Sequence, residues 1–149
     1  MARLACLALA LSLTACDTDG AGRLNPQEVR VHALSHDPSA LVGTWVLATV
    51  TPSGECGGDG CTRTRPAAEA GRSERIAFGA DGTAEVARAG EPARRVPYRV
   101  ERIDYGNGTR SETPHLFIGT RTEAFGVAGD KLFLDSRPVD GELLEYRRR

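Results

Sequence analysis

The sequence of 149 residues has few aromatic side chains, a single lysine and no excess of charge of either sign. Aromatic residues make up 5% of the chain, which is too few for the stacking surfaces that bind sugars or nucleic-acid bases. Lys and Arg together number 19 and Asp and Glu 20, so the chain lacks the basic balance of a nucleic-acid-binding protein. The same balance argues against attachment to anionic lipid by charge alone. The length predicts one domain.

The chain also lacks a hydrophobic run long enough to cross a bilayer. The apolar run from Leu4 to Leu13 follows the positive charge of Arg3. As a helix it would span about 15 Å, half of a hydrocarbon core of about 30 Å. It therefore predicts a secretory signal peptide over residues 1–15 and not a transmembrane helix.

This run ends in Leu13-Thr14-Ala15-Cys16, which resembles the lipobox of bacterial lipoproteins. The resemblance implies cleavage before Cys16, a diacylglycerol on its thiol, and further acylation of the palmitate type. Several acyl chains on one residue exceed what stable membrane anchoring needs. We therefore expect a lipoprotein of the bacterial cell envelope, facing the periplasm or the cell exterior, with no cofactor besides this covalent lipid. An ordinary signal peptide and a cytosolic start are the alternatives.

Only two cysteines remain for the folded domain, because Cys6 leaves with the predicted signal peptide and Cys16 carries the predicted lipid. Cys56 and Cys61 enclose three glycines and one aspartate in an oxidising compartment, which favours a disulfide across a short turn. A metal site would need more ligands nearby, and a redox dithiol prefers two intervening residues. We expect a structural disulfide and no metal.

Residues 16–40 read as the lipidated cysteine and a flexible tether. Residues 17–22 are small and mostly polar. Asn25 could cap a short helix, on which His32 and His36 would lie one turn apart. That spacing suits two metal ligands, but solvated polar side chains are the simpler interpretation.

Residues 41–149 alternate with a period of two between turn residues, which predicts strands and hairpins. A long irregular connection over 52–72 carries the predicted disulfide. The short turns favour an antiparallel, up-and-down barrel of eight strands, all-β, over a β-sandwich. The predicted strands cover residues 41–51, 74–78, 83–88, 93–104, 114–119, 123–127, 131–135 and 142–147. The residues predicted to point inward are Leu47, Ile76, Phe78, Ala84, Val86, Val96, Tyr98, Val100, Leu116, Ile118, Phe125, Val127, Leu132, Leu134, Leu144 and Tyr146.

Several motifs of this region together resemble bacterial lipocalin-like lipoproteins. Gly43-Thr44-Trp45 opens the first strand, the 76–83 hairpin carries Phe-Gly-Ala-Asp-Gly-Thr, and 140–148 forms the final strand. The resemblance covers the whole of the predicted barrel, 41–149. It implies that Trp45 closes one end of the barrel, with an arginine of the last strand, Arg147 or Arg148, packed over the ring.

The sequence leaves two functions open. In the first, the tethered barrel binds a small hydrophobic ligand in an apolar pocket at the end opposite Trp45, lined by Phe78, Tyr98, Phe125 and Tyr146. In the second, the barrel is filled by its own side chains and serves as a structural, interaction or inhibitor subunit, recognising a protein through loop 52–72. Catalysis is not expected, because His115 is the only histidine of the domain and no nucleophile elbow or phosphate loop is present.

Overall fold

A computed structural model of the chain describes residues 30–52, 63–106, 108–137 and 141–149. Within these ranges the chain forms nine strands and two short 3-10 helices, with no α-helix. The helices are η1 (Val31–Ala33) and η2 (Pro38–Leu41). The strands are β1 (Gly43–Pro52), β2 (Arg65–Pro66), β3 (Glu74–Phe78), β4 (Thr83–Arg88), β5 (Arg94–Glu101), β6 (His115–Ile118), β7 (Arg121–Ala128), β8 (Lys131–Asp135) and β9 (Glu142–Arg148).

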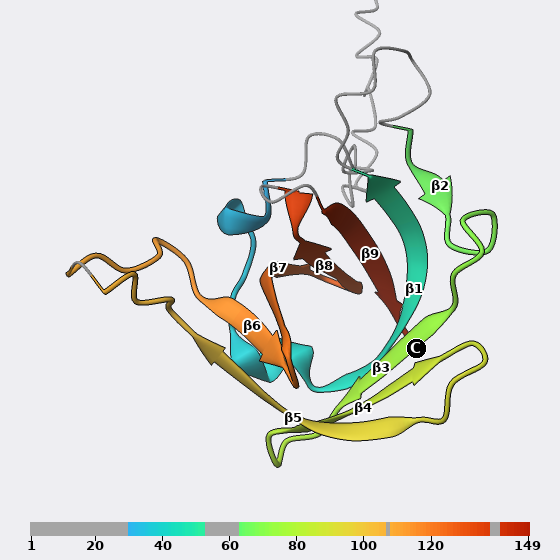
Figure 1. Cartoon of the computed structure of the whole chain (residues 1–149), viewed down its shortest axis with the longest axis horizontal. Helices are drawn as coiled ribbons and strands as arrows, with labels where there is room; N and C mark the ends of the chain where they lie inside the picture. The colour runs from blue at the N-terminus through green and yellow to red at the C-terminus, as the bar shows by residue number, and fades with distance from the viewer. Residues whose placement is uncertain (1–29, 53–62, 107, 138–140) are drawn as a thin grey trace, which may run out of the picture.

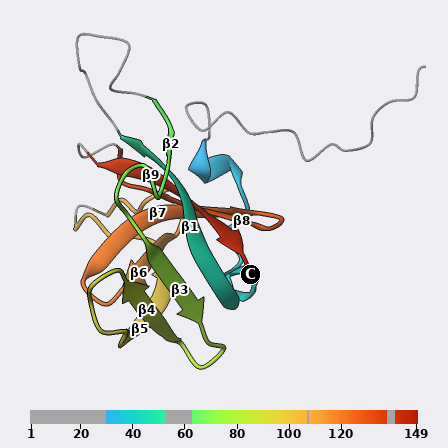
Figure 2. The same cartoon turned by 90° about the vertical axis from the view of Figure 1, so that its right-hand side faces the viewer.

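The strands close into an antiparallel barrel (Figure 1). From β3 to β9 each strand pairs with the next, and β9 pairs back onto β1 from Trp45↔Arg148 to Pro52↔Glu142. Figure 2 shows β1 and β9 side by side along this closing ladder. The eight predicted strands are all present as β1 and β3–β9, which confirms the up-and-down barrel and excludes the sandwich. Closure leaves no long edge on which another chain could add a strand.

One strand was not expected. The two residues of β2, inside the predicted irregular connection 52–72, pair with Thr49 and Val50 where β3 no longer follows β1. Ala67, directly after β2, is buried in the core. The described part of this connection is therefore attached to the barrel wall.

The barrel interior is filled with side chains. Every residue predicted to point inward belongs to one apolar cluster, in which Val86, Val96, Tyr98 and Val100 are partly buried and the others are buried. Period-two alternation therefore identified the inner face of each strand correctly. The cluster also contains Leu41, Trp45, Val50 and Ala67.

Trp45 closes one end of the barrel, which we call the closed end. Its ring is fully buried, and its Nε1 donates a hydrogen bond of 2.7 Å to the Leu41 carbonyl of η2. The Arg148 guanidinium lies 4.4 Å above the ring centroid. The same guanidinium donates to the Ala40 carbonyl at 2.6 Å and the Val42 carbonyl at 2.8 Å. Arg148 thus fastens the last strand, the tryptophan and η2 to one another.

Of the two candidate arginines, Arg147 takes no part in this contact. It points to the outer face of β9, where it pairs with Glu145 and Asp130. The close approach of Arg148 explains the glycine at position 43, because a Cβ there would lie 2.9 Å from the Arg148 Nη1. Gly43 also has a φ of +131°, which other residues rarely adopt.

The end of the predicted tether packs against the barrel. Val31 and Leu34 cover Phe133 and Leu143, two apolar residues on the outer faces of β8 and β9. Ser35 then exchanges two backbone hydrogen bonds with Val127, at 3.2 and 2.8 Å. The folded unit therefore begins before the predicted start at 41 and includes residues 31–40.

The segment also departs from the predicted helix. η1 ends at Ala33, and the bridge at Ser35 is extended, so His32 and His36 do not share a helical face. His32 is exposed, whereas the His36 ring packs edge-on against Phe125 at 5.3 Å. The predicted cap at Asn25 lies outside the described residues.

Replacing Trp45 tests the closed end. Trp45→Phe leaves the buried Leu41 carbonyl without its donor and removes ring volume under Arg148, so we expect a loss of about 2 kcal/mol in the free energy of unfolding. Urea denaturation of the full chain measures the loss. Arg95→Ala removes a guanidinium from an ion pair with Asp81 that is exposed on both sides, so it serves as the control and should change stability by less than about 0.5 kcal/mol. An unchanged midpoint for Trp45→Phe would contradict the closure.

Replacing Val31 tests whether the N-terminal segment belongs to the folded unit. Val31→Asp places a charge at a site that is 3% exposed, against Phe133 and Leu143, so stability should fall by at least about 2 kcal/mol. His32→Asp introduces the same charge one residue later at an exposed position and should have little effect. Thermal unfolding of the two variants distinguishes a packed segment from a free tether. In a free tether, Val31→Asp and His32→Asp would have the same small effect.

Candidate functional site

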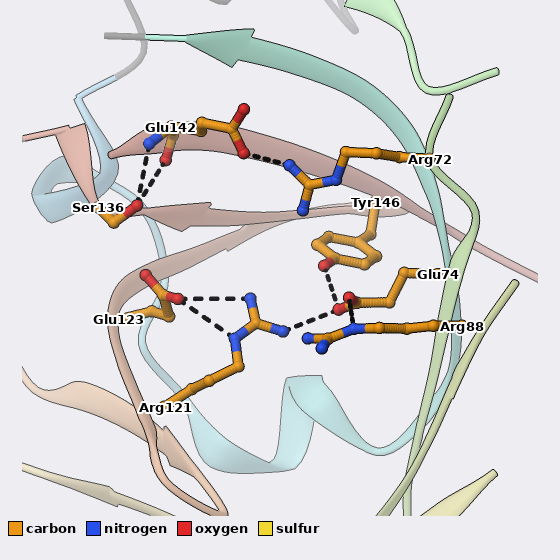
Figure 3. Close-up of polar contacts among 8 residues, drawn as sticks. All are labelled: Arg72, Glu74, Arg88, Arg121, Glu123, Ser136, Glu142 and Tyr146. Atoms are coloured by element: carbon orange, nitrogen blue, oxygen red, sulfur yellow. Dashed lines mark hydrogen bonds and ion pairs between the residues drawn. The ribbon is translucent and has the colours of Figure 1, made fainter. Parts of the chain in front are cut away.

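The barrel holds a polar cavity of about 430 Å³ at the end opposite Trp45, which we call the open end (Figure 3). Along β3, Phe78 pairs with Gly43 at the closed end, and Glu74 lies at the other end. The starts of β3, β7 and β9 and the end of β4 surround the cavity. It is lined by Gly71, Arg72, Ser73, Glu74, Arg88, Ala89, Glu91, Arg121, Glu123, Ser136, Glu142 and Leu144.

A buried carboxylate lies at the base of this cavity. Glu74, the first residue of β3, is 4% exposed and has the same inward orientation as Ile76 and Phe78. Its Oε2 accepts a hydrogen bond of 2.6 Å from Arg88 Nε on the neighbouring strand. Its Oε1 accepts from Arg121 Nη1 at 2.8 Å and from the Tyr146 hydroxyl at 2.7 Å. Four strands thus meet at one carboxylate.

These contacts fix the charge states of the group. Burial alone opposes ionisation of Glu74, but Arg121, Tyr146 and Arg88 outweigh it and hold the pKa of Glu74 below its ordinary value. Burial and the neighbouring Glu74 carboxylate raise the pKa of Tyr146, so its hydroxyl remains a donor. The pKa of Arg121 is raised despite its burial, because the Glu74 and Glu123 carboxylates favour the charged form.

Glu123 is a second, less completely paired carboxylate. Its Oε1 accepts two long bonds from Arg121, 3.4 Å from Nε and 3.3 Å from Nη2. Burial raises the pKa of Glu123, and Arg121 offsets this only in part. Figure 3 shows the second oxygen of Glu123 turned away from Arg121, and it accepts no hydrogen bond from a described residue.

The rim of the cavity carries a further ion pair, between Arg72 and Glu142. The backbone of Glu142 is held by Ser136: its N–H donates to Ser136 Oγ at 2.9 Å, and its carbonyl accepts from the same hydroxyl at 3.2 Å. Both side chains of the pair remain more than one third exposed, so the contact itself adds little stability. It nevertheless places a carboxylate and a guanidinium at the entrance.

The four residues predicted to line an apolar pocket do not form one. Phe78 and Tyr98 pack edge-on at 4.9 Å near the closed end, where the Tyr98 hydroxyl donates to the Gly79 carbonyl at 2.8 Å. Phe125 packs against His36, and Tyr146 binds Glu74. Each ring is thus occupied by protein atoms, because the barrel is narrow enough for its own side chains to fill it.

Other predicted site residues fall outside the described part of the chain. Cys16, Cys56 and Cys61 all lie there, so the lipid anchor and the disulfide stay predictions. Of loop 52–72, the described residues 63–72 include β2 and reach the open end, where Arg72 lines the cavity. Within the described residues no three histidine, cysteine, aspartate or glutamate side chains are grouped to hold a metal ion.

Sequence reasoning missed the charged cavity, although the signal for it is present. The alternation that places Ile76 and Phe78 inside also places Glu74 inside, and the one that places Phe125 inside extends back through Glu123 to Arg121. A charged residue at the inward position of a strand end marks a site where the interior becomes polar.

Comparison with known proteins adds no identity to this geometry. The sequence matches no protein-family model, and no curated protein or solved structure matches the chain. None of the helical segments that the structure describes has the length and hydropathy of a membrane span.

Substitution of the buried carboxylate tests the base of the cavity. Glu74→Gln leaves Arg88 without a counter-charge and Arg121 with only the long contacts to Glu123, so we expect a loss of about 3 kcal/mol in stability at pH 7 by urea denaturation. Because the pKa of Glu74 is lower when folded than when unfolded, its contribution is complete above the ordinary value and disappears as the pH falls through the folded value. The difference in the free energy of unfolding between wild type and Glu74→Gln should therefore become smaller in acid.

The matched control is Glu85→Gln, which removes an exposed carboxylate that pairs with Arg75 on the outer face of the same hairpin. Its effect should stay below about 0.5 kcal/mol at every pH. Equal effects of the two substitutions would contradict a stabilising role for the buried carboxylate.

Proposed function

We propose that the protein is a lipid-anchored binding protein of the bacterial cell envelope, which binds a small polar ligand in the open-end cavity. The lipobox-like sequence ending in Cys16 supports the anchor, which would leave the folded barrel beside the membrane. The cavity supports the binding role, because about 430 Å³ falls within the range of small-molecule sites.

The observation that carries the proposal is the contrast between a filled interior and a charged opening. Apolar side chains occupy the barrel from Trp45 to Leu144, so the proposed ligand is not hydrophobic. At the opening, the side chains of Arg72, Arg88 and Arg121 stand among carboxylates and extend from strands or their immediate ends. Polar groups held on rigid strands are already oriented before a ligand arrives, which lowers the entropic cost of binding.

A second candidate is recognition of a protein partner by the barrel surface. The hairpin between β5 and β6 exposes Tyr105, at 59% of its full accessibility. Its base is held by Ser111, whose hydroxyl accepts from the Ile103 N–H at 2.9 Å and donates to the Thr113 carbonyl at 2.8 Å. An exposed tyrosine on an ordered hairpin is a residue type that contributes strongly to interfaces.

Filling the cavity tests the first proposal. Ala89 lines the cavity, and Ala89→Trp would occupy it without removing any charged group. Native mass spectrometry of the full-length lipoprotein, released from detergent after incubation with a fraction of small polar metabolites, should show a bound small molecule. Ala89→Trp should lose this added mass. Ala93→Trp, an equally exposed position on the same connection but outside the cavity, should retain it.

Two results would contradict the proposal. One is the absence of any bound molecule at millimolar metabolite concentrations. The other is undiminished binding by Ala89→Trp, which would place the ligand elsewhere on the barrel. If Ala89→Trp keeps the added mass and Tyr105→Ala loses it, the ligand binds at the β5–β6 hairpin.

A further inference from the structure

Several side chains of the open-end cavity keep hydrogen-bonding groups that have no partner among the described residues. Within the described residues, Arg121 contacts only one oxygen of Glu123, and Arg72 contacts only one oxygen of Glu142. Figure 3 shows the second oxygen of each carboxylate directed away from its arginine. Both carboxylates come from the side of the cavity where β7 and β9 begin.

The free donors belong to arginines near the start of β3 and at the end of β4. Arg88 contacts Glu74 through Nε, so both of its terminal nitrogens are without a partner among the described residues. Arg72 contacts Glu142 through Nη1 and likewise leaves Nη2 and Nε. In Figure 3 the Arg72 guanidinium lies against the Glu142 carboxylate, and the Arg88 guanidinium lies beside Glu74.

We propose that the cavity binds a small zwitterion, with its ammonium group between Glu123 and Glu142 and its carboxylate against Arg72 and Arg88. This assignment rests on the proposed binding function and specifies the class of its ligand. The chemistry matches on both sides, because carboxylates accept hydrogen bonds from an ammonium group and guanidinium nitrogens donate to a carboxylate.

The charge balance of the cavity favours a zwitterion over a simple ion. Its arginines are Arg72, Arg88 and Arg121, and its carboxylates are those of Glu74, Glu91, Glu123 and Glu142, so the lining is close to neutral. A lone anion would meet the carboxylates of Glu123 and Glu142, and a lone cation would meet the guanidiniums of Arg72 and Arg88, so part of the lining repels a simple ion of either sign. A ligand with both charges keeps the lining balanced.

Glu74 acts here as a positioning residue. By accepting from Arg88 Nε and Arg121 Nη1, it holds both guanidiniums in place and turns the remaining nitrogens of Arg88 to the cavity. The Tyr146 hydroxyl also donates a hydrogen bond to the Glu74 carboxylate, so Glu74 is not available to bind the ammonium group of a ligand.

Titration calorimetry with matched probes tests the assignment on the full-length lipoprotein in detergent. The probes are glycine, glycylglycine and triglycine, together with N-acetylglycylglycine, which lacks the ammonium charge, and glycylglycinamide, which lacks the carboxylate. We expect at least one of the three zwitterions to bind, at least tenfold more tightly than either blocked dipeptide. Arg88→Gln should weaken binding of the zwitterion and leave glycylglycinamide unaffected, and Glu142→Gln should weaken it and leave N-acetylglycylglycine unaffected.

The matched control is Arg99→Gln, on the outer face of β5, which should bind every probe as the wild type does. Equal affinities for blocked and unblocked dipeptides would overturn the assignment, as would tighter binding of glycylglycinamide than of any zwitterion. If none of the probes binds while polar metabolites still add mass in a cavity-dependent way, the zwitterion assignment fails and the binding function stands.

Discussion

The open end of this barrel depends on one buried ion: the carboxylate of Glu74, held by Arg88, Arg121 and Tyr146. A carboxylate that is 4% exposed would be strongly destabilising without partners, and here each oxygen has at least one. The partners come from β4, β7 and β9, so satisfying the carboxylate requires the correct relative position of four strands. Buried ion pairs often contribute little net stability compared with apolar packing, so we interpret this one as fixing geometry.

The two ends of the barrel follow opposite chemistry. At the closed end, Arg148 connects Trp45 and η2. Its guanidinium packs on the Trp45 ring and donates to two backbone carbonyl groups. At the open end, Arg72 and Arg88 keep nitrogens without described partners, beside carboxylates that keep free oxygens. The interior between the ends is filled. A ligand for this barrel therefore meets a shallow charged site and not a deep apolar one.

Much of the fold could be predicted from the sequence, because alternation is a local property. The pattern of Ile76 and Phe78, or of Leu132 and Leu134, is enough to assign the inner face of a strand. The outward-facing Phe133 indicates that another segment covers the outer face of β8. The sequence alone does not show that this segment contains Val31 and Leu34. Their role depends on a contact between residues about a hundred positions apart.

The candidate site was harder to predict for the same reason. Alternation places Glu74 and Arg121 inside, but it does not say that they meet across the barrel, 47 positions apart in the chain. That contact follows from closure and from the register of every intervening hairpin. The apolar pocket was predicted from residue type alone, and it fails because Phe78, Tyr98, Phe125 and Tyr146 each find a partner within the protein.

The most direct test of a preorganised charged site is a titration of the individual glutamates by carbon-detected NMR on the full-length protein. The ordinary pKa of a glutamate is 4.5, and we expect Glu74 to titrate below it and Glu123 above it. Opposite shifts of the two carboxylates that share Arg121 would show that Glu74 is the better paired of the two. A pKa of Glu74 at or above 4.5 would contradict the buried ion on which the open end is built.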